Sequence, residues 1–166
     1  AIIVATGFET YDPHLKPELG YGKYPQVVTT LDFEQILNRQ SQTLAPHASA
    51  GVVNPKSIVF IQCVGSRDQA IGCGDHKSQT NPYCSRVCCM VTAKQARLVR
   101  EQFPNAAVTV FYMDVRAFGK GFEEFYDQAR EDGVMYRRGN PSEILKRGER
   151  VVVRAEDTLL GEPIEV

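Results

Sequence analysis

Apolar residues follow two different periods along the second two thirds of the chain. Three short runs are continuously apolar and β-branched, which is typical of strands buried in a parallel sheet, and they span 57–63, 107–115 and 134–137. Apolar residues at helical spacing predict helices between these runs, over 84–103 and 122–131. The order strand-helix-strand-helix-strand predicts an α/β fold with a parallel sheet and right-handed crossovers.

The first third of the chain has a different pattern. Residues 1–7 form an apolar run that predicts a buried strand, whereas 8–54 are rich in Pro, Gly, Tyr and polar residues. Such a composition is typical of a connection between domains. Within it, Thr30 as an N-cap and apolar positions on one face predict a short helix over 30–38.

The end of the chain predicts an antiparallel hairpin. Residues 150–155 and 163–166 are apolar runs on either side of a turn that contains glycine. We therefore divide the chain into 1–55, the end of a strand plus an interdomain connection, and 56–166, an α/β domain. The chain opens in mid-strand at Ala1, and its last strand is followed by no turn or polar tail, so we interpret it as an internal fragment.

Composition and charge exclude several classes of function. The 166 residues carry 19 basic and 20 acidic side chains, and the net charge of -1 gives no reason to expect nucleic acid or an anionic lipid surface as partner. The longest apolar runs are far shorter than the roughly 20 residues of a membrane-spanning helix. We expect a cytoplasmic protein with no direct membrane insertion.

The loop after the first buried strand is where an α/β sheet would hold a ligand. A dinucleotide site needs the pattern G-x-G-x-x-G at this place, because its glycines let the backbone approach a pyrophosphate. Residues 63–68 contain a single glycine, Gly65. We therefore expect no NAD(P) site, although Asp114 follows the second strand as an acidic residue would in such a site.

The chemistry of this loop is indicated by its cysteines. Cys63 ends the first strand, Cys73 lies in the long loop, and Cys84, Cys88 and Cys89 open the predicted helix. On that helix Cys84 and Cys88 share one face, and Cys89 points about 100° around the axis. Thiolates on several sides suit a [4Fe–4S] cluster, and a helix N-terminus favours thiolates and an anionic cluster.

Three other interpretations of the cysteines stay open at this point. Structural disulfides would leave one odd cysteine and would have to accommodate the adjacent pair Cys88 and Cys89. Structural zinc usually takes two C-x-x-C motifs, which this chain lacks. Buried thiols without any ligand are the third interpretation. The pattern favours iron and sulfur over these alternatives.

Four stretches of the chain resemble the A subunit of heterodisulfide reductase and its relatives, among them flavoprotein subunits of the quinone-interacting oxidoreductase complex of sulfate reducers. They are 61–68, with C-V-G-S-R, 81–90, with Y-C-S-R-x-C-C, 111–118 and 156–161. The resemblance implies the Rossmann-like, nicotinamide-domain-like part of a thioredoxin-reductase-like flavoprotein, in which an iron-sulfur cluster takes the place of NAD.

The resemblance also implies a set of cluster ligands. The four ligands of the family correspond to Cys63, Cys84, Cys88 and Cys89. The loop before Cys84 is longer than the family pattern and contains Cys73, which is an alternative ligand or a free thiol.

Further implications concern FAD and the partners. Ala5, Thr6 and Gly7 look like the segment with which the FAD domain passes the chain to its second domain. FAD would then belong to the parent protein and be absent from this fragment. The partners implied are other iron-sulfur subunits of a heterodisulfide-reductase-like or quinone-interacting complex.

Two functions of different class follow from the sequence. The first is an electron-transfer domain of an iron-sulfur flavoprotein, which relays single electrons between FAD and other iron-sulfur centres and is not catalytic on its own. In that case Arg67 and Arg86, which neighbour cluster cysteines, would raise the reduction potential by their charge. The alternative is a structural zinc-binding or subunit-interaction module without redox activity.

Overall fold

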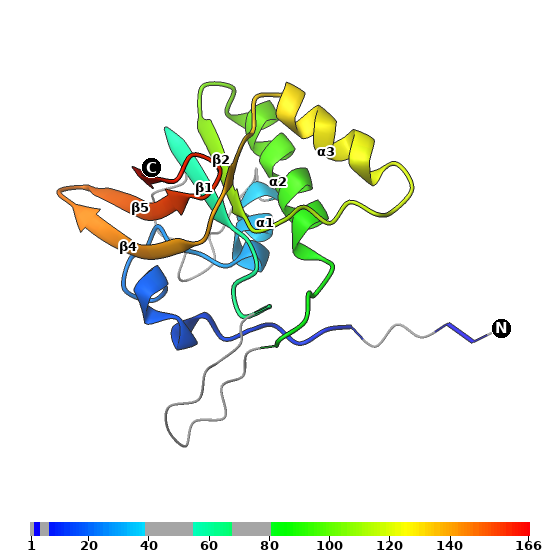
Figure 1. The fold of residues 1–166 in the computed structure, drawn as a ribbon, viewed down its shortest axis with the longest axis horizontal. Helices are drawn as coiled ribbons and strands as arrows, with labels where there is room; N and C mark the ends of the chain where they lie inside the picture. Colours follow the sequence, from blue (N-terminus) through cyan, green and yellow to red (C-terminus); the bar gives the residue numbers. More distant parts are fainter. Residues whose placement is uncertain (1, 4–6, 39–54, 68–80) are drawn as a thin grey trace, which may run out of the picture.

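The computed structural model describes residues 2–3, 7–38, 55–67 and 81–166. Within these ranges the chain forms two three-stranded sheets and three α-helices, with two short 3-10 turns before them (Figure 1). The elements in chain order are η1 (Pro13–Leu15), η2 (Pro17–Leu19), α1 (Thr30–Asn38), β1 (Ser57–Ile61), α2 (Cys88–Gln102), β2 (Ala107–Tyr112), α3 (Phe122–Glu131), β3 (Met135–Arg138), β4 (Pro141–Arg147), β5 (Arg150–Asp157) and β6 (Glu162–Glu165).

The first sheet is parallel and has the order β1-β2-β3, with α2 between β1 and β2 and α3 between β2 and β3. This confirms the predicted α/β fold. The register places Phe60 opposite Val110 and Phe111 opposite Arg137. β1 and β2 end before the predicted residues, because the chain after each strand bends into the loops that form the candidate site.

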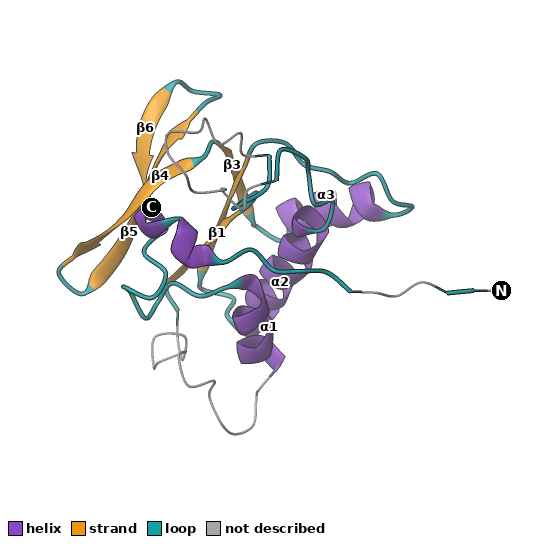
Figure 2. Ribbon diagram, turned by 90° about the horizontal axis from the view of Figure 1, so that it is seen from below, coloured by secondary structure: helices purple, strands orange, loops and turns teal. Residues whose placement is uncertain are grey.

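The parallel sheet is covered on both faces, which explains why β1 and β2 are largely apolar, whereas the edge strand β3 carries two arginines. Alternate side chains point to opposite sides. Phe60, Val108 and Val110 pack with the three helices, whereas Val59 and Phe111 pack with the antiparallel sheet. Helices and antiparallel strands therefore form separate outer layers, as Figure 2 shows by colour. No helix among the described residues is long and apolar enough to cross a membrane.

Helix α1 has the predicted bounds but a different cap. The hydroxyl of Thr29 accepts a hydrogen bond from the amide of Asp32 at 3.1 Å and donates one to its carboxylate at 2.7 Å. This reciprocal pair caps the helix, so the prediction of Thr30 as N-cap is wrong. Phe33 and Leu37 then reach the core beside α2. The division of the chain at residue 55 stays a prediction.

The antiparallel sheet has the order β4-β5-β6. The predicted C-terminal hairpin is confirmed as β5 and β6, and β4 is an additional strand that the sequence pattern did not indicate. A buried carboxylate joins this sheet to the parallel one. Asp157 accepts a hydrogen bond from the amide of Leu159 at 3.0 Å and forms an ion pair with Arg137 of β3 at 3.2 Å. The two sheets are thus held together at the end of β5.

Candidate metal centre

The candidate site begins where β1 ends. Two stretches, 63–67 and 81–84, run side by side there and are joined by backbone hydrogen bonds. The amide of Asn81 donates to the carbonyl of Gly65 at 3.0 Å, and the amide of Arg67 donates to the carbonyl of Tyr83 at 3.2 Å. These bonds bring Cys63 and Cys84 to the same edge of the sheet, although they are distant in sequence.

Three residues beside the site adopt left-handed backbone conformations that L-residues avoid. Cys63, Arg67 and Arg86 have φ values of 62°, 60° and 62°, and they are the non-glycine residues with positive φ in the described part of the chain. Each such conformation costs about 1–2 kcal/mol relative to the right-handed one. Backbone strain of this kind concentrates at functional sites, where the surrounding structure maintains it. The strained backbone at these three residues therefore marks the loops that position the cysteine and arginine side chains of the candidate site.

Helix α2 begins at Cys88, so the prediction that the helix starts at Cys84 is wrong. The left-handed Arg86 interrupts right-handed helical geometry, and Val87 is the first residue with helical φ and ψ. Cys84 consequently lies in the loop before the helix and does not share a helix face with Cys88. The cysteines come from three segments: the end of β1, the loop before α2 and the first turn of α2.

The thiols lie close enough to change one another's acidity. The thiol of Cys88 raises the pKa of Cys63 above its ordinary value, and burial acts in the same direction. The pKa of Cys89 is raised by the same two causes. In turn, the thiols of Cys63 and Cys89 hold the pKa of Cys88 well below its usual range. Ionisation of Cys88 is therefore favoured over that of its two neighbours.

Backbone amides also point at the sulfur atoms. The amide of Arg86 donates to Sγ of Cys84 at 3.3 Å, and the amide of Arg116, after β2, donates to Sγ of Cys89 at 3.4 Å. Hydrogen bonds to cysteine sulfur are one means by which proteins set the potential of iron-sulfur clusters. The four described cysteines form no disulfide. Among the described residues, no three or more His, Cys, Asp or Glu side chains converge as the ligands of a single metal ion do.

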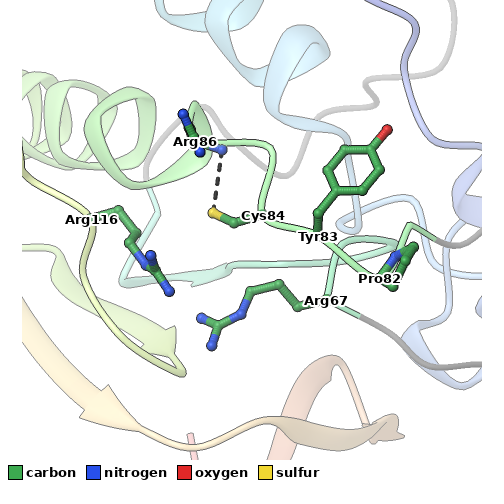
Figure 3. Close-up of a pocket in the computed structure, with 6 residues that line it drawn as sticks. All are labelled: Arg67, Pro82, Tyr83, Cys84, Arg86 and Arg116. Carbon is green, nitrogen blue, oxygen red and sulfur yellow. Dashed lines mark hydrogen bonds between the residues drawn. The ribbon is translucent and has the colours of Figure 1, made fainter.

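A cavity of about 580 Å³ opens beside Cys84 and is strongly basic. Figure 3 shows the side chains of Arg67 and Arg116 extending toward each other beneath this cysteine. Both pair with Asp114, at 2.6 Å from Arg67 and 3.2 Å from Arg116. Arg116, and then Arg67, hold the pKa of Asp114 below its ordinary value. The cavity is lined by Arg67, Pro82, Tyr83, Cys84, Arg86 and Arg116.

The lining of the cavity stays positive even with Asp114 ionised, since two arginines, Arg67 and Arg116, share this one carboxylate and Arg86 adds a third positive charge. The charge of Arg67 favours the thiolate form of Cys63, against the larger effects that raise the pKa of this thiol. The pKa of Arg116 is raised, first by Asp114 and further by the charges of Cys84 and Cys89. A second feature is the side-chain amide of Gln62, whose Oε1 lies 3.7 Å from Sγ of Cys89 and whose Nε2 is buried without a hydrogen-bond partner. Thiolate ligands, amide donors and positive charge together fit an anionic iron-sulfur cluster.

Comparison with known proteins gives relatives over nearly the whole chain. The A subunit of H(2):CoB-CoM heterodisulfide,ferredoxin reductase from Methanothermobacter thermautotrophicus is 46% identical over 170 residues, which cover 99% of this chain and 24% of the relative. The iron-sulfur A subunit of CoB--CoM heterodisulfide reductase from Methanocaldococcus jannaschii is 43% identical, with the same two coverages. The chain is a homologue of one part of the heterodisulfide reductase A subunit. No family model matches it.

The identity extends to more distant A subunits of heterodisulfide reductases. The one from the ferredoxin:CoB-CoM heterodisulfide reductase of Methanosarcina mazei is 40% identical over 96% of this chain and 19% of its own length. The chain thus spans about a quarter or less of the curated relatives it matches. The family resemblance inferred from the cysteine motifs is confirmed.

The structure describes some of the predicted site residues and not others. The thiols of Cys63, Cys88 and Cys89 lie close together at the carboxyl end of the parallel sheet, and Cys84 lies in the adjoining loop. The role of all four as ligands stays a prediction. Cys73, Ala5 and Thr6 lie outside the described residues. Gly7 is exposed, with a φ of 74°.

Sequence reasoning missed three residues of the site. Asp114 was considered only as part of a dinucleotide site, and Arg116 and Gln62 were not considered as site residues. A usable signal existed, because ligands of parallel sheets lie beyond the carboxyl ends of the strands. Gln62 follows β1, and Asp114 and Arg116 follow β2, so all three belong to that edge.

Proposed function

We propose that this chain is the cluster-bearing electron-transfer part of a flavoprotein of the heterodisulfide reductase A-subunit type. Cys63, Cys84, Cys88 and Cys89 hold a [4Fe–4S] cluster in this proposal. The cluster passes single electrons between FAD, which is bound elsewhere in the parent protein, and other iron-sulfur centres. The chain by itself is not catalytic.

One observation carries this proposal: the thiols of Cys63, Cys88 and Cys89 interact with one another beyond the carboxyl end of β1. Cys84 lies in the neighbouring loop before α2, and its sulfur and that of Cys89 accept backbone N–H groups. A cubane takes four thiolates, so the number of cysteines suits it. The positive charge of Arg67 and Arg116 opposes the negative charge of four thiolates around iron and sulfide. The names of relatives, several of which are called iron-sulfur subunits, support the same function.

The residues of the chain would perform separable tasks. The thiolates bind iron, and the amides of Arg86 and Arg116 orient Cys84 and Cys89 through N–H···S hydrogen bonds. Asp114 fixes the guanidinium groups of Arg67 and Arg116 next to the sulfur atoms and removes part of their charge. Because a reduced cluster carries one more negative charge, this balance of charge sets how readily it accepts an electron.

The partners of the proposed function are other iron-sulfur subunits of a heterodisulfide-reductase-like or quinone-interacting complex. The relatives are named as subunits of reductases, which supports an assembly of several polypeptides. NAD(P) has no part in the proposal, since Cys63 and Arg67 stand in the loop where a dinucleotide site would need glycines. Electrons are then exchanged through clusters and flavin.

Anaerobic reconstitution with iron and sulfide tests the proposal. We expect about four iron and about four sulfide per chain, a brown colour that bleaches with dithionite, and an electron paramagnetic resonance signal in the reduced state. A colourless protein that binds stoichiometric zinc and no iron would instead establish the structural zinc module. The matched control is a variant with all four ligand cysteines replaced by serine, which should bind neither iron nor sulfide.

Thiol labelling tests the ligand set. If Cys63, Cys84, Cys88 and Cys89 bind the cluster, labelling of the reconstituted protein should modify Cys73 alone. The variant Cys73→Ser should then retain its iron and its spectrum. Protection of Cys73 together with labelling of Cys63 would assign the fourth ligand to the loop cysteine.

A further inference from the structure

Gln62 is a buried glutamine that directly precedes the proposed ligand Cys63 in the sequence. It is 3% exposed, and its backbone N–H donates a hydrogen bond to the carbonyl of Phe111 on β2 at 3.1 Å. The residue is thereby anchored to the parallel sheet. A fully buried amide side chain normally has hydrogen-bond partners for both its oxygen and its nitrogen, so a missing partner at either atom needs an explanation.

The two ends of the Gln62 side-chain amide have different surroundings. The Oε1 atom lies 3.7 Å from Sγ of Cys89, whose single S–H group can donate to it or to the carbonyl of Asp114 at 3.8 Å. The Nε2 atom is buried and has no partner. Two N–H donors are thus removed from water without compensation, which is unfavourable unless another state of the site uses them.

Coordination of Cys89 to iron would change what Gln62 faces. A cysteine that binds a metal is a thiolate and has no S–H group to donate. The Oε1 atom would then lie against the sulfur as one acceptor against another. Rotation of the terminal amide by half a turn exchanges Oε1 and Nε2, so that an N–H group points at the sulfur.

We propose that Gln62 is a positioning residue that donates an N–H···S hydrogen bond from Nε2 to Cys89 and so raises the reduction potential of the cluster. This inference rests on the proposed function. It accounts for the orphaned Nε2, which gains a partner when the cysteine loses its proton. Together with the amide of Arg116, it gives Cys89 two N–H donors.

The direction of the effect follows from charge. Reduction adds one electron to the cluster and its sulfur ligands, and an N–H dipole directed at a sulfur stabilises the added negative charge. Removal of the donor should therefore make the cluster harder to reduce. The effect should be confined to the potential, because Gln62 supplies no ligand.

The test compares Gln62→Met and Gln62→Glu with the wild-type chain after anaerobic reconstitution. Methionine keeps the length of the side chain without a donor, and glutamate keeps an acceptor without the amide donor. We expect both variants to bind as much iron as wild type and to shift the midpoint potential, in redox titration followed by paramagnetic resonance, to more negative values. Glutamate should give the larger shift because it also adds negative charge.

A second readout detects the hydrogen bond itself. With glutamine labelled by ¹⁵N, electron-nuclear double resonance of the reduced wild-type cluster should show an exchangeable proton and a nitrogen coupling that Gln62→Met lacks. The matched control is Gln95→Met, since Gln95 is also a buried glutamine, 1% exposed, but donates to the carbonyl of Thr30 in α1. This control should lose stability without any change in midpoint potential.

The outcomes separate the inference from the proposed function. A wild-type chain that binds no iron and shows no reduced-state signal overturns both. Full iron binding with the same potential and the same proton coupling in wild type and Gln62→Met overturns the role of Gln62 alone. An equal negative shift in Gln95→Met would assign the effect to general loosening of the core, which also overturns it.

Discussion

The two ends of α2 are completed in opposite ways. At the C-terminal end the chain satisfies its own polar groups: the amide of Phe103 donates to the carbonyl of Val99 at 2.7 Å, and Arg100 donates to the carbonyls of Asp132 and Ala106, each at 2.8 Å. At the N-terminal end the N-cap is Val87, an exposed apolar residue that makes no side-chain cap hydrogen bond. The C-terminal end is thus capped by the protein's own groups, and the N-terminal end has no side-chain cap.

This difference shows how the same helix serves both stability and chemistry. A polar N-cap is typically worth about 1 kcal/mol, and the helix forgoes it at Val87. The first turn instead places the thiols of Cys88 and Cys89 at the positive end of the helix dipole, where negative charge is stabilised. An anionic cluster at this end would supply the missing stabilisation, which predicts that changes at the two ends have separable effects.

The largest expected effect is at the N-terminal end. Cys88→Ser or Cys89→Ser should abolish cluster assembly, because each removes one of four iron ligands and a hydroxyl is a poor substitute for a thiolate. Iron and sulfide analysis of the anaerobically reconstituted variants measures the result, with Cys73→Ser as the matched control. Full iron content in both helix variants would contradict the ligand assignment.

The corresponding change at the C-terminal end is Arg100→Met. It leaves the carbonyls of Asp132 and Ala106 without their charged donor, which should lower the free energy of unfolding by about 2 kcal/mol. Urea denaturation measures this loss, and iron binding at low denaturant should match wild type. Loss of iron in this variant at full folding would show that the two ends are not independent.

Smaller effects are expected from charges beside the N-terminal end. Asp114→Asn removes the carboxylate between Arg67 and Arg116 and should make the cluster easier to reduce, whereas Arg67→Gln should make it harder. After allowance for solvent screening at these partly exposed groups, we expect about 1 kcal/mol, or about 40 mV for a one-electron couple. Redox titration of both variants checks the sign, and shifts in the same direction would refute the electrostatic explanation.

The smallest effect concerns the left-handed residue that sets the start of α2. Glycine adopts the φ of 62° found at Arg86 without strain but loses more entropy on folding, so Arg86→Gly should be more stable than Arg86→Ala by about 0.5 kcal/mol. The alanine variant is the matched control because both lack the arginine side chain. Equal unfolding midpoints in urea would indicate that the strain is relieved by other means.

The regular elements were predictable to different extents. The bounds of α1 and α3 agree with the prediction, because in each segment the apolar residues repeat at helical spacing and residues that favour helix ends flank it. The start of α2 was placed at Cys84 because apolar spacing continues upstream of Cys88, whereas the chain leaves the helix at Arg86. Strand β4 was missed because Pro141 opens it and most of its residues are polar, charged or exposed, which hides the alternating pattern.

The cysteines of the candidate site could be recognised from the sequence, and their surroundings could not. Five cysteines within one segment, four of them in the motifs C-V-G-S-R and Y-C-S-R-x-C-C, indicate the chemistry without coordinates. The partners of these cysteines are a different matter. Arg116 reaches Cys89 through its backbone amide, a group that every residue but proline has and that no sequence motif marks.

The sequence by itself determined the family, the order of the core strands and helices, and the segment that carries the cysteines. These properties depend on residue type and on spacing along the chain, which are local. The tertiary structure decided that Cys84 lies off the helix, that an antiparallel sheet covers one face of the parallel sheet, and that the Nε2 atom of Gln62 is buried without a partner. Such properties depend on which distant groups meet in a closely packed interior, where hydrogen bonding and burial are settled by neighbours from other parts of the chain.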